Sequence, residues 1–82
     1  MRTIRRYLNR KFYDAKDSHY VALPQIAALI RAGEEIKVTE KATGRDITTA
    51  TMAQILFEES KHGHPLPITG LRKIIVSGMP IE

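Results

Sequence analysis

Apolar and polar residues alternate with a period of two in several short stretches of this 82-residue chain, a pattern typical of strands that bury one face. Residues 36–40 (IKVTE) give the clearest case, and a polar turn at 42–44 (ATG) follows them. The glycine of that turn tolerates a positive φ. Residues 45–48 are then expected to return as the partner strand, and an additional strand is expected over residues 3–8.

A helical pattern of apolar residues follows the first expected hairpin. Ile26, Leu29 and Ile30 lie on one face of a helix. Pro24 suits the first turn of that helix, and Gly33 suits its C-terminal cap. The sequence therefore predicts an amphipathic helix between Pro24 and Gly33.

A second helix is predicted after the second hairpin, with Met52, Ile55 and Leu56 as its apolar stripe. Thr49 is expected to cap its N-terminus, and residues 61–63 (KHG) are expected to end it.

Residues 64–67 (HPLP) cannot continue a helix and are expected to form a connector. A short third helix is expected after Thr69, with Leu71, Ile74 and Ile75 on one face. Since residues 74–76 (IIV) are β-branched, a strand is the alternative there.

The two halves of the chain resemble each other in residue character. Sliding the sequence so that Phe12 meets Val38 also brings Val21 onto Ile47, which predicts that all four lie in the core. The predicted fold class is α+β, a small antiparallel sheet with helices on one face, made of two ββα pseudo-repeats plus a C-terminal helix. We expect a domain over residues 1–63 and a C-terminal extension over residues 64–82. The other face of the sheet is left free for a partner.

The net charge of +4 is concentrated at the N-terminus. Residues 1–16 carry several Arg and Lys side chains against one acid, Asp14, whereas acids outnumber bases in residues 17–60. Clustered cations gain free energy by displacing counterions from phosphates, so this asymmetry favours a phosphate-rich partner. An anionic membrane surface and a basic face kept for solubility are the alternatives.

Composition and spacing argue against enzymes and metal proteins. Cysteine is absent, which excludes disulfides and thiol chemistry, and no apolar run is long enough to span a membrane, so we expect a cytoplasmic protein. The acidic pairs at 34–35 and 58–59 do not face each other on a helix, and the glycines form no phosphate-binding loop. His62 and His64 offer only two metal ligands. We therefore expect no enzymatic activity, cofactor or metal.

The N-terminal segment carries the side chains that recognise nucleic acid. Arg and Lys contact phosphates, Arg and Asn can also read base edges, and a two-stranded ribbon fits a major groove. The candidates of this kind are Arg5, Arg6, Asn9, Arg10 and Lys11. Packing explains Phe12, but the pattern leaves the roles of Tyr7, Tyr13 and Tyr20 open between core and interface.

Several segments in order, over about residues 3–60, carry a resemblance to a known family. They are 7–14 (YLNRKFYD), 20–21 (YV), 33–35 (GEE), 43–48 (TGRDIT) and 54–59 (QILFEE). Together they resemble the N-terminal DNA-binding domain of the polyhydroxyalkanoate (PHA/PHB) synthesis regulators.

This resemblance implies a bacterial repressor that binds double-stranded DNA at promoters of granule-coat (phasin) genes and leaves the DNA when polymer granules capture it. The DNA-facing set that it implies is Arg5, Arg6, Asn9, Arg10, Lys11 and Tyr13.

The chain departs from the family pattern at two places. Leu8 stands where the family usually has proline, which removes a rigid kink and predicts more continuous strand pairing. Residues 61–82 are far shorter than the C-terminal region by which longer members engage granules. The expected function is a repressor-like DNA-binding transcriptional regulator. The alternative is a protein-interaction or granule-surface module without sequence-specific DNA binding.

We expect the chain to act as a homodimer or higher homo-oligomer, because a small sheet needs its edges covered and two-fold symmetry uses one half-site contact twice. Residues 66–81, which are largely apolar, are the expected subunit contact.

Overall fold

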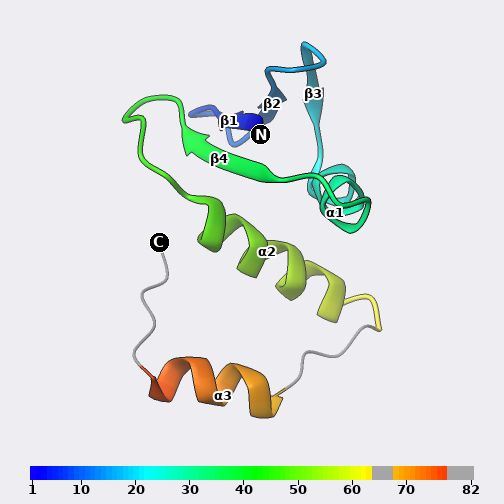
Figure 1. Ribbon diagram of the computed structural model, residues 1–82, viewed down its shortest axis with the longest axis vertical. Coiled ribbons are helices and arrows are strands. Elements are labelled where there is room, and N and C mark those ends of the chain that lie inside the picture. Colours follow the sequence, from blue (N-terminus) through cyan, green and yellow to red (C-terminus); the bar gives the residue numbers. More distant parts are fainter. Residues whose placement is uncertain (64–67, 78–82) are drawn as a thin grey trace.

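The computed structural model describes residues 1–63 and 68–77. In them the chain forms β1 (Arg2–Arg6), β2 (Phe12–Asp14), β3 (His19–Val21), α1 (Leu23–Arg31), β4 (Ile36–Glu40), α2 (Thr48–Ser60) and α3 (Ile68–Val76). The strands form one sheet in the order β3-β2-β1-β4, and α1 and α2 lie to one side of it (Figure 1). The predicted α+β class is confirmed.

The sheet is mixed, which corrects the predicted antiparallel sheet. β2 pairs antiparallel with both β1 and β3, whereas β4 pairs parallel with β1. The parallel pair arises because the chain crosses from β3 through α1 and then enters the sheet on the far side of β1. As a result β1, the most basic strand, lies in the middle of the sheet.

The second predicted hairpin does not form. Residues 45–48 contribute one isolated bridge, between Thr39 and Asp46, in place of a strand. The Asp46 carboxylate accepts hydrogen bonds from the backbone N–H and the hydroxyl of Thr48 (2.9 and 2.6 Å), and this local bonding turns the chain directly into α2. The pseudo-repeat is therefore not confirmed. The predicted cap Thr49 is also wrong, because α2 begins at Thr48 with Ile47 as its N-cap.

The core lies between the sheet and the two helices α1 and α2. Its buried apolar residues are Ile4, Phe12, Val21, Ile26, Ala27, Ile36, Val38, Ile47 and Ile55. The predicted burial of Phe12, Val21, Val38 and Ile47 is confirmed. Because side chains alternate along a strand, the positions between these buried ones point to the open face of the sheet.

Helix α1 follows the predicted pattern at both ends. Pro24 lies in its first turn, and Gly33 adopts a φ of +93° just after its end. The N–H groups of Gly33 and Glu34 donate to the carbonyls of Ile30 and Leu29, which is the Schellman arrangement that glycine allows. This sharp return directs Glu34 toward the start of β1.

Helix α2 is covered on one side only. Thr51 and Ile55 are buried, but Met52 and Leu56, which were predicted to share an inward stripe with Ile55, are exposed. The helix ends as predicted, with Gly63 in the left-handed region.

Residues 68–76 form α3, so the alternative strand at 74–76 is wrong, and Thr69 lies inside the helix because α3 begins at Ile68. No residue of α3 is buried. The predicted connector at 64–67, with His64, lies outside the described residues, as do residues 78–81 of the predicted subunit contact. Among the helices of residues 1–63 and 68–77, none combines the length and apolar character needed to cross a lipid bilayer.

Candidate functional site

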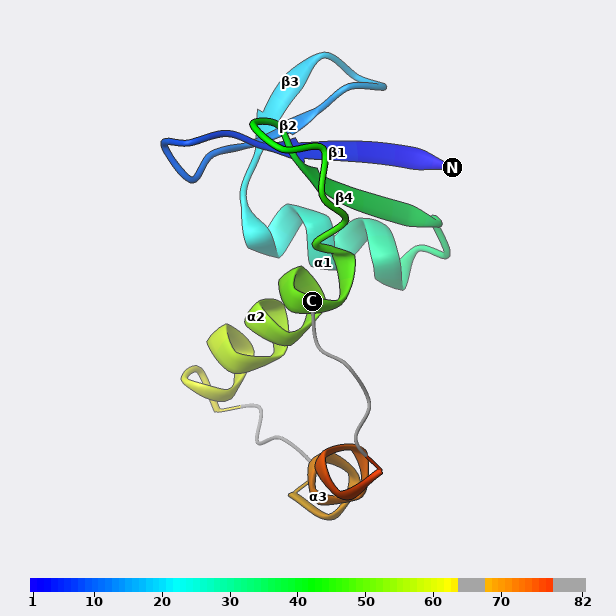
Figure 2. The ribbon, with the colours of Figure 1, turned by 90° about the vertical axis from the view of Figure 1, so that its left-hand side faces the viewer.

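One face of the sheet is turned away from α1 and α2 (Figure 2). This open face carries cationic and aromatic side chains. Arg5 of β1 lies opposite Tyr13 of β2, and Tyr13 lies opposite Tyr20 of β3. On its other side Arg5 lies opposite Thr39 of β4. Directly opposed residues share a face of the sheet, so this row crosses all the strands on the open side.

Three tyrosines pack together at one end of this row. The ring centroids of Tyr7, Tyr13 and Tyr20 lie 5.3 to 6.4 Å apart in edge-to-face arrangements, a favourable geometry for aromatic pairs. The Lys11 ammonium lies 5.6 Å from the centroid of Tyr20, within the range of a cation–π interaction. The tyrosines whose roles the sequence left open therefore form one cluster that supports Lys11.

The loop between β1 and β2 is a tight hairpin. The Arg10 N–H donates to the Tyr7 carbonyl, and the Tyr7 N–H donates to the Lys11 carbonyl, both at 2.9 Å. The Asn9 side-chain oxygen accepts the Lys11 N–H at 3.1 Å. Leu8 and Asn9 thus occupy the centre of the turn, so the strand expected over residues 3–8 ends at Arg6. All the residues from Leu8 to Lys11 are exposed at the tip.

Arg10 has a φ of +65°, in the left-handed region. Three-residue hairpin loops commonly place glycine at this position, and a residue with a Cβ is strained there. Strain of this kind is concentrated at functional sites, where the side chain is needed. Arginine at this position thus points to a role for its guanidinium outside the fold.

Replacing Arg10 with glycine is expected to raise the free energy of unfolding by about 1 kcal/mol, because glycine adopts positive φ without steric cost. Urea unfolding followed by circular dichroism measures the change. Ser18→Gly is the matched control, since Ser18 also has a positive φ (54°) but lies in the β2–β3 turn. An Arg10→Gly chain less stable than the wild type would contradict the assignment of strain.

The residues that the family resemblance implies as DNA-facing lie in three different places in the structure. Arg5 and Tyr13 lie on the open face, and Asn9, Arg10 and Lys11 form the exposed loop beside it. The remaining member, Arg6, lies opposite the buried Phe12 and is half-buried, so it shares the helix-covered side of the sheet.

Two lysines that sequence reasoning missed extend this cationic surface. Lys37 lies on β4 opposite Thr3, between two buried positions, and is exposed on the open side. The Lys41 N–H donates to the Arg6 carbonyl at 2.9 Å, which brings the loop after β4 beside the first hairpin. A shallow hollow between the loops is lined by Tyr7, Leu8, Asn9, Lys41 and Ala42. No local sequence signal marks these lysines, because their proximity depends on the parallel pairing of β1 and β4.

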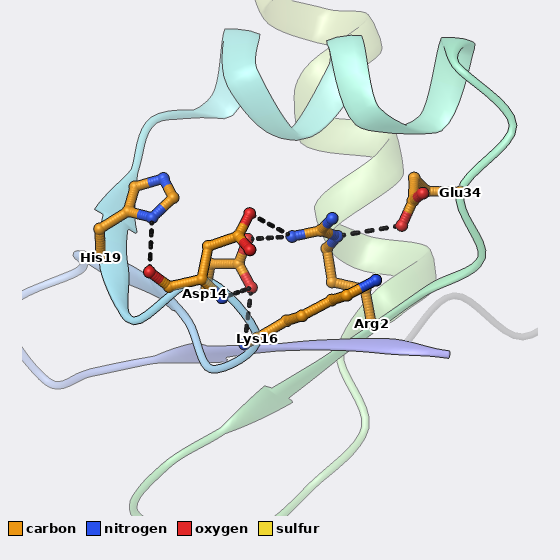
Figure 3. A network of polar contacts seen from close by, with 6 residues as sticks. Arg2, Asp14, Lys16, His19 and Glu34 are labelled. Atoms are coloured by element: carbon orange, nitrogen blue, oxygen red, sulfur yellow. Dashed lines mark hydrogen bonds and ion pairs between the residues drawn. The ribbon is translucent and has the colours of Figure 1, made fainter.

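Arg2, by contrast, is removed from the basic surface. Its guanidinium bonds to the carboxylates of Asp14 and Glu34 (3.1 Å), as Figure 3 shows, and also to that of Asp17 (2.9 Å). Arg2 is 8% exposed and Asp14 1% exposed. Burial alone would raise the pKa of Asp14, but hydrogen bonds from Arg2 and from the N–H groups of Lys16 and Asp17 outweigh it and hold the pKa below its usual value. Fewer unpaired cations are therefore available near the N-terminus than the sequence count suggests, because Arg2 is paired with carboxylates.

The described residues contain no group of three His, Cys, Asp or Glu side chains placed to hold a metal ion. His62 is exposed just beyond α2, and its predicted partner His64 lies outside the described residues.

Residues 3–63 match the family model described as the PHB/PHA accumulation regulator DNA-binding domain. A protein of Allochromatium vinosum described as uncharacterized is 37% identical over 65 residues, which cover 79% of this chain and 42% of that protein. A protein of Thiocystis violacea described as lying in the phbA 5′ region is also 37% identical over 65 residues, which cover 79% of this chain and 47% of that protein. The chain thus spans a little under half the length of these relatives. No solved structure is significantly similar to the chain.

Proposed function

The chain belongs to the PHB/PHA accumulation regulator DNA-binding domain family, and we propose that it binds double-stranded DNA as a transcriptional regulator. The family is one of regulator domains, not of enzymes. The observation that carries the proposal is the β1–β2 hairpin loop, which presents Asn9, Arg10 and Lys11 at its exposed tip while Arg5 and Tyr13 lie on the adjoining open face. These are the residues that we propose contact DNA, with Arg6 at the margin.

A two-stranded ribbon is narrow enough to enter the major groove of B-form DNA. The Arg10 guanidinium at the tip can donate two parallel hydrogen bonds to a guanine edge. The Asn9 oxygen already accepts the Lys11 N–H, which leaves the amide NH₂ and the second lone pair of the oxygen for contact with a base edge. Lys37 and Lys41 both lie on the β4 side of the ribbon and suit phosphates beside it.

We further propose that the regulation is repression and that it acts on genes of polyhydroxyalkanoate accumulation, granule-coat (phasin) genes among them. Family membership supports this target, and so does the relative described by its place in the phbA 5′ region. A ribbon bound at a promoter would act by occupying DNA that transcription requires, in the bacterial cytoplasm.

Salt dependence of binding tests this function. Four cations on phosphates predict a slope of log affinity on log salt of about −3.6, so raising salt from about 50 to 200 mM should weaken binding roughly a hundredfold. Fluorescence anisotropy on labelled promoter duplexes, with unlabelled competitor DNA, measures both the slope and the preference among fragments. Equal affinity for every fragment would contradict sequence-specific regulation.

The second candidate is a protein-interaction or granule-surface module, which is favoured by the 56% exposure of Tyr20 on the open face. Binding through the tyrosine cluster would depend little on salt, because apolar contacts carry no counterion release. A complex that forms with granule-coat protein at unchanged affinity over the same salt range, together with no DNA binding, would favour this candidate.

A further inference from the structure

Two apolar surfaces of the chain are left uncovered. On α2, Met52, Leu56 and Phe57 are 39, 44 and 54% exposed, and on α3, Ile68 and Ile75 are 78 and 73% exposed. Exposed apolar side chains gathered on one surface mark interaction sites more often than isolated ones do. The fold therefore offers two candidate contact surfaces at the end of the molecule away from the sheet (Figures 1 and 2).

The first surface is a groove between α1 and α2. It is lined by Ala27, Ile30, Arg31, Met52, Ile55 and Leu56, which we call the α1–α2 groove. Every lining side chain except Arg31 is apolar, and Arg31 is engaged by the Glu59 carboxylate at 2.6 Å. The groove is therefore suited to an apolar helix face rather than to a polar ligand.

The second surface is the apolar face of α3. Ile68, Leu71 and Ile75 recur at i, i+3 and i+7, and Ile74 lies beside them. This spacing is the one by which an amphipathic helix anchors in a groove. Since α3 buries no residue, its apolar face has no complete cover within the described structure.

The two surfaces are also complementary in charge. The charged residues of α3 are Arg72 and Lys73, and those of α2 are Glu58 and Glu59. Both acids lie in the last turn of α2, where the helix dipole favours cations, and each already pairs with a cation, Glu58 with Lys61 at 3.6 Å and Glu59 with Arg31 at 2.6 Å. Arg72 and Lys73 beside the groove would extend these two ion pairs into a larger network at a helix end that favours cations, which argues for α3 as the occupant.

We propose that α3 of a second copy of the chain occupies the α1–α2 groove, and that the contact is reciprocal in a two-fold symmetric homodimer. Each copy carries both surfaces, and its own α3 leaves both of them exposed. Residues 1–63 then form the DNA-binding domain, and the segment after them supplies the subunit contact. The dimer would present two hairpin loops to two half-sites, but the contact itself does not depend on DNA binding.

Light scattering coupled to size exclusion, at rising micromolar concentration, tests this contact on the whole 82-residue chain. The wild type is expected to run as a dimer. Leu56→Glu in the groove and Ile75→Glu on α3 are each expected to give monomers, with far-ultraviolet circular dichroism unchanged because both side chains are exposed. Ala53→Glu is the matched control, since it adds the same charge to α2 outside the groove lining, and it is expected to remain dimeric.

Mixing the two variants distinguishes a second copy from the chain's own α3. The Leu56→Glu chain keeps an intact α3 and the Ile75→Glu chain keeps an intact groove, so the mixture is expected to recover dimers where each alone is monomeric. A monomeric wild type, a dimer that survives both substitutions, or a mixture that recovers nothing would each overturn the proposal. Anisotropy with promoter DNA on the same samples would show whether DNA binding persists in that case.

Discussion

Replacing Asp14 with asparagine is expected to lower the free energy of unfolding by roughly 3 kcal/mol, because one partner of a buried ion pair is removed. Asp14 is almost wholly buried, and its carboxylate accepts the Arg2 guanidinium and the N–H groups of Lys16 and Asp17. Asparagine keeps the shape but leaves the buried cation with weaker partners. Urea unfolding at neutral pH measures the loss.

Asp17→Asn is the matched control, since Asp17 bonds the same guanidinium but its side chain is 52% exposed. An exposed ion pair contributes less than about 1 kcal/mol, so this variant should stay close to the wild type. If Asp14→Asn were equally mild, the network would be a surface feature rather than part of the core.

A second check is the pH dependence of the difference in unfolding free energy between the wild type and Asp14→Asn. The pKa of Asp14 is lower in the folded chain than its usual value, so the folded state binds fewer protons than the unfolded chain near that pKa. The contribution of Asp14 to stability is therefore present above about pH 4 and is lost as the pH falls through the folded pKa. The gap between wild type and Asp14→Asn should narrow in acid, and a gap that is constant with pH would contradict the buried ion pair.

Sequence patterns correctly predicted the helices and strands that are stabilised mainly by contacts between residues close in sequence. The Pro24 and Gly33 signals marked both ends of α1. Alternation placed Val38 in the core, and the alignment of Phe12 with Val38 placed Phe12 there too. The same reasoning was wrong at residues 45–48, because bonds from Thr48 to the Asp46 side chain replaced the expected strand. A short polar side chain that accepts a hydrogen bond from a neighbouring backbone N–H competes with strand pairing. The alternation of apolar and polar residues does not reveal this competition.

The candidate site was predictable only in part for a related reason. The exposed loop at Asn9, Arg10 and Lys11 follows from adjacency in the sequence. The burial of Arg2 and the approach of Lys41 to the loop depend on the order of the strands instead, since β4 joins β1 in parallel only after α1 has crossed the sheet. Counting charge along the chain therefore wrongly included Arg2 in the N-terminal basic surface. It also missed Lys37 of β4 and Lys41 just after β4.

Replacing both Arg10 and Lys11 with alanine is expected to weaken DNA binding on the order of a hundredfold, because the two cations at the hairpin tip contribute base-edge and phosphate contacts. The slope of log affinity on log salt should become shallower by about 0.9, since the phosphate contact of Lys11 is lost, whereas the proposed Arg10 contact is to a base edge. Both effects are measured in one anisotropy titration repeated over a salt series. A change in affinity with no change in slope would indicate that neither side chain contacts a phosphate.

The control must remove the same charge without touching the hairpin. Lys16→Ala/Lys61→Ala does so, because Lys16 lies in the turn at the opposite end of β2 and Lys61 lies just beyond α2. This variant should bind nearly as the wild type does, through an unchanged tip. The variant Arg10→Gly/Lys11→Ala distinguishes loss of the DNA contact from a change in the fold of the hairpin. Glycine relieves the strained backbone at position 10, while the guanidinium is still lost. If that variant recovered wild-type affinity, backbone strain rather than the missing cation would have caused the defect, and the hairpin tip would not be the interface.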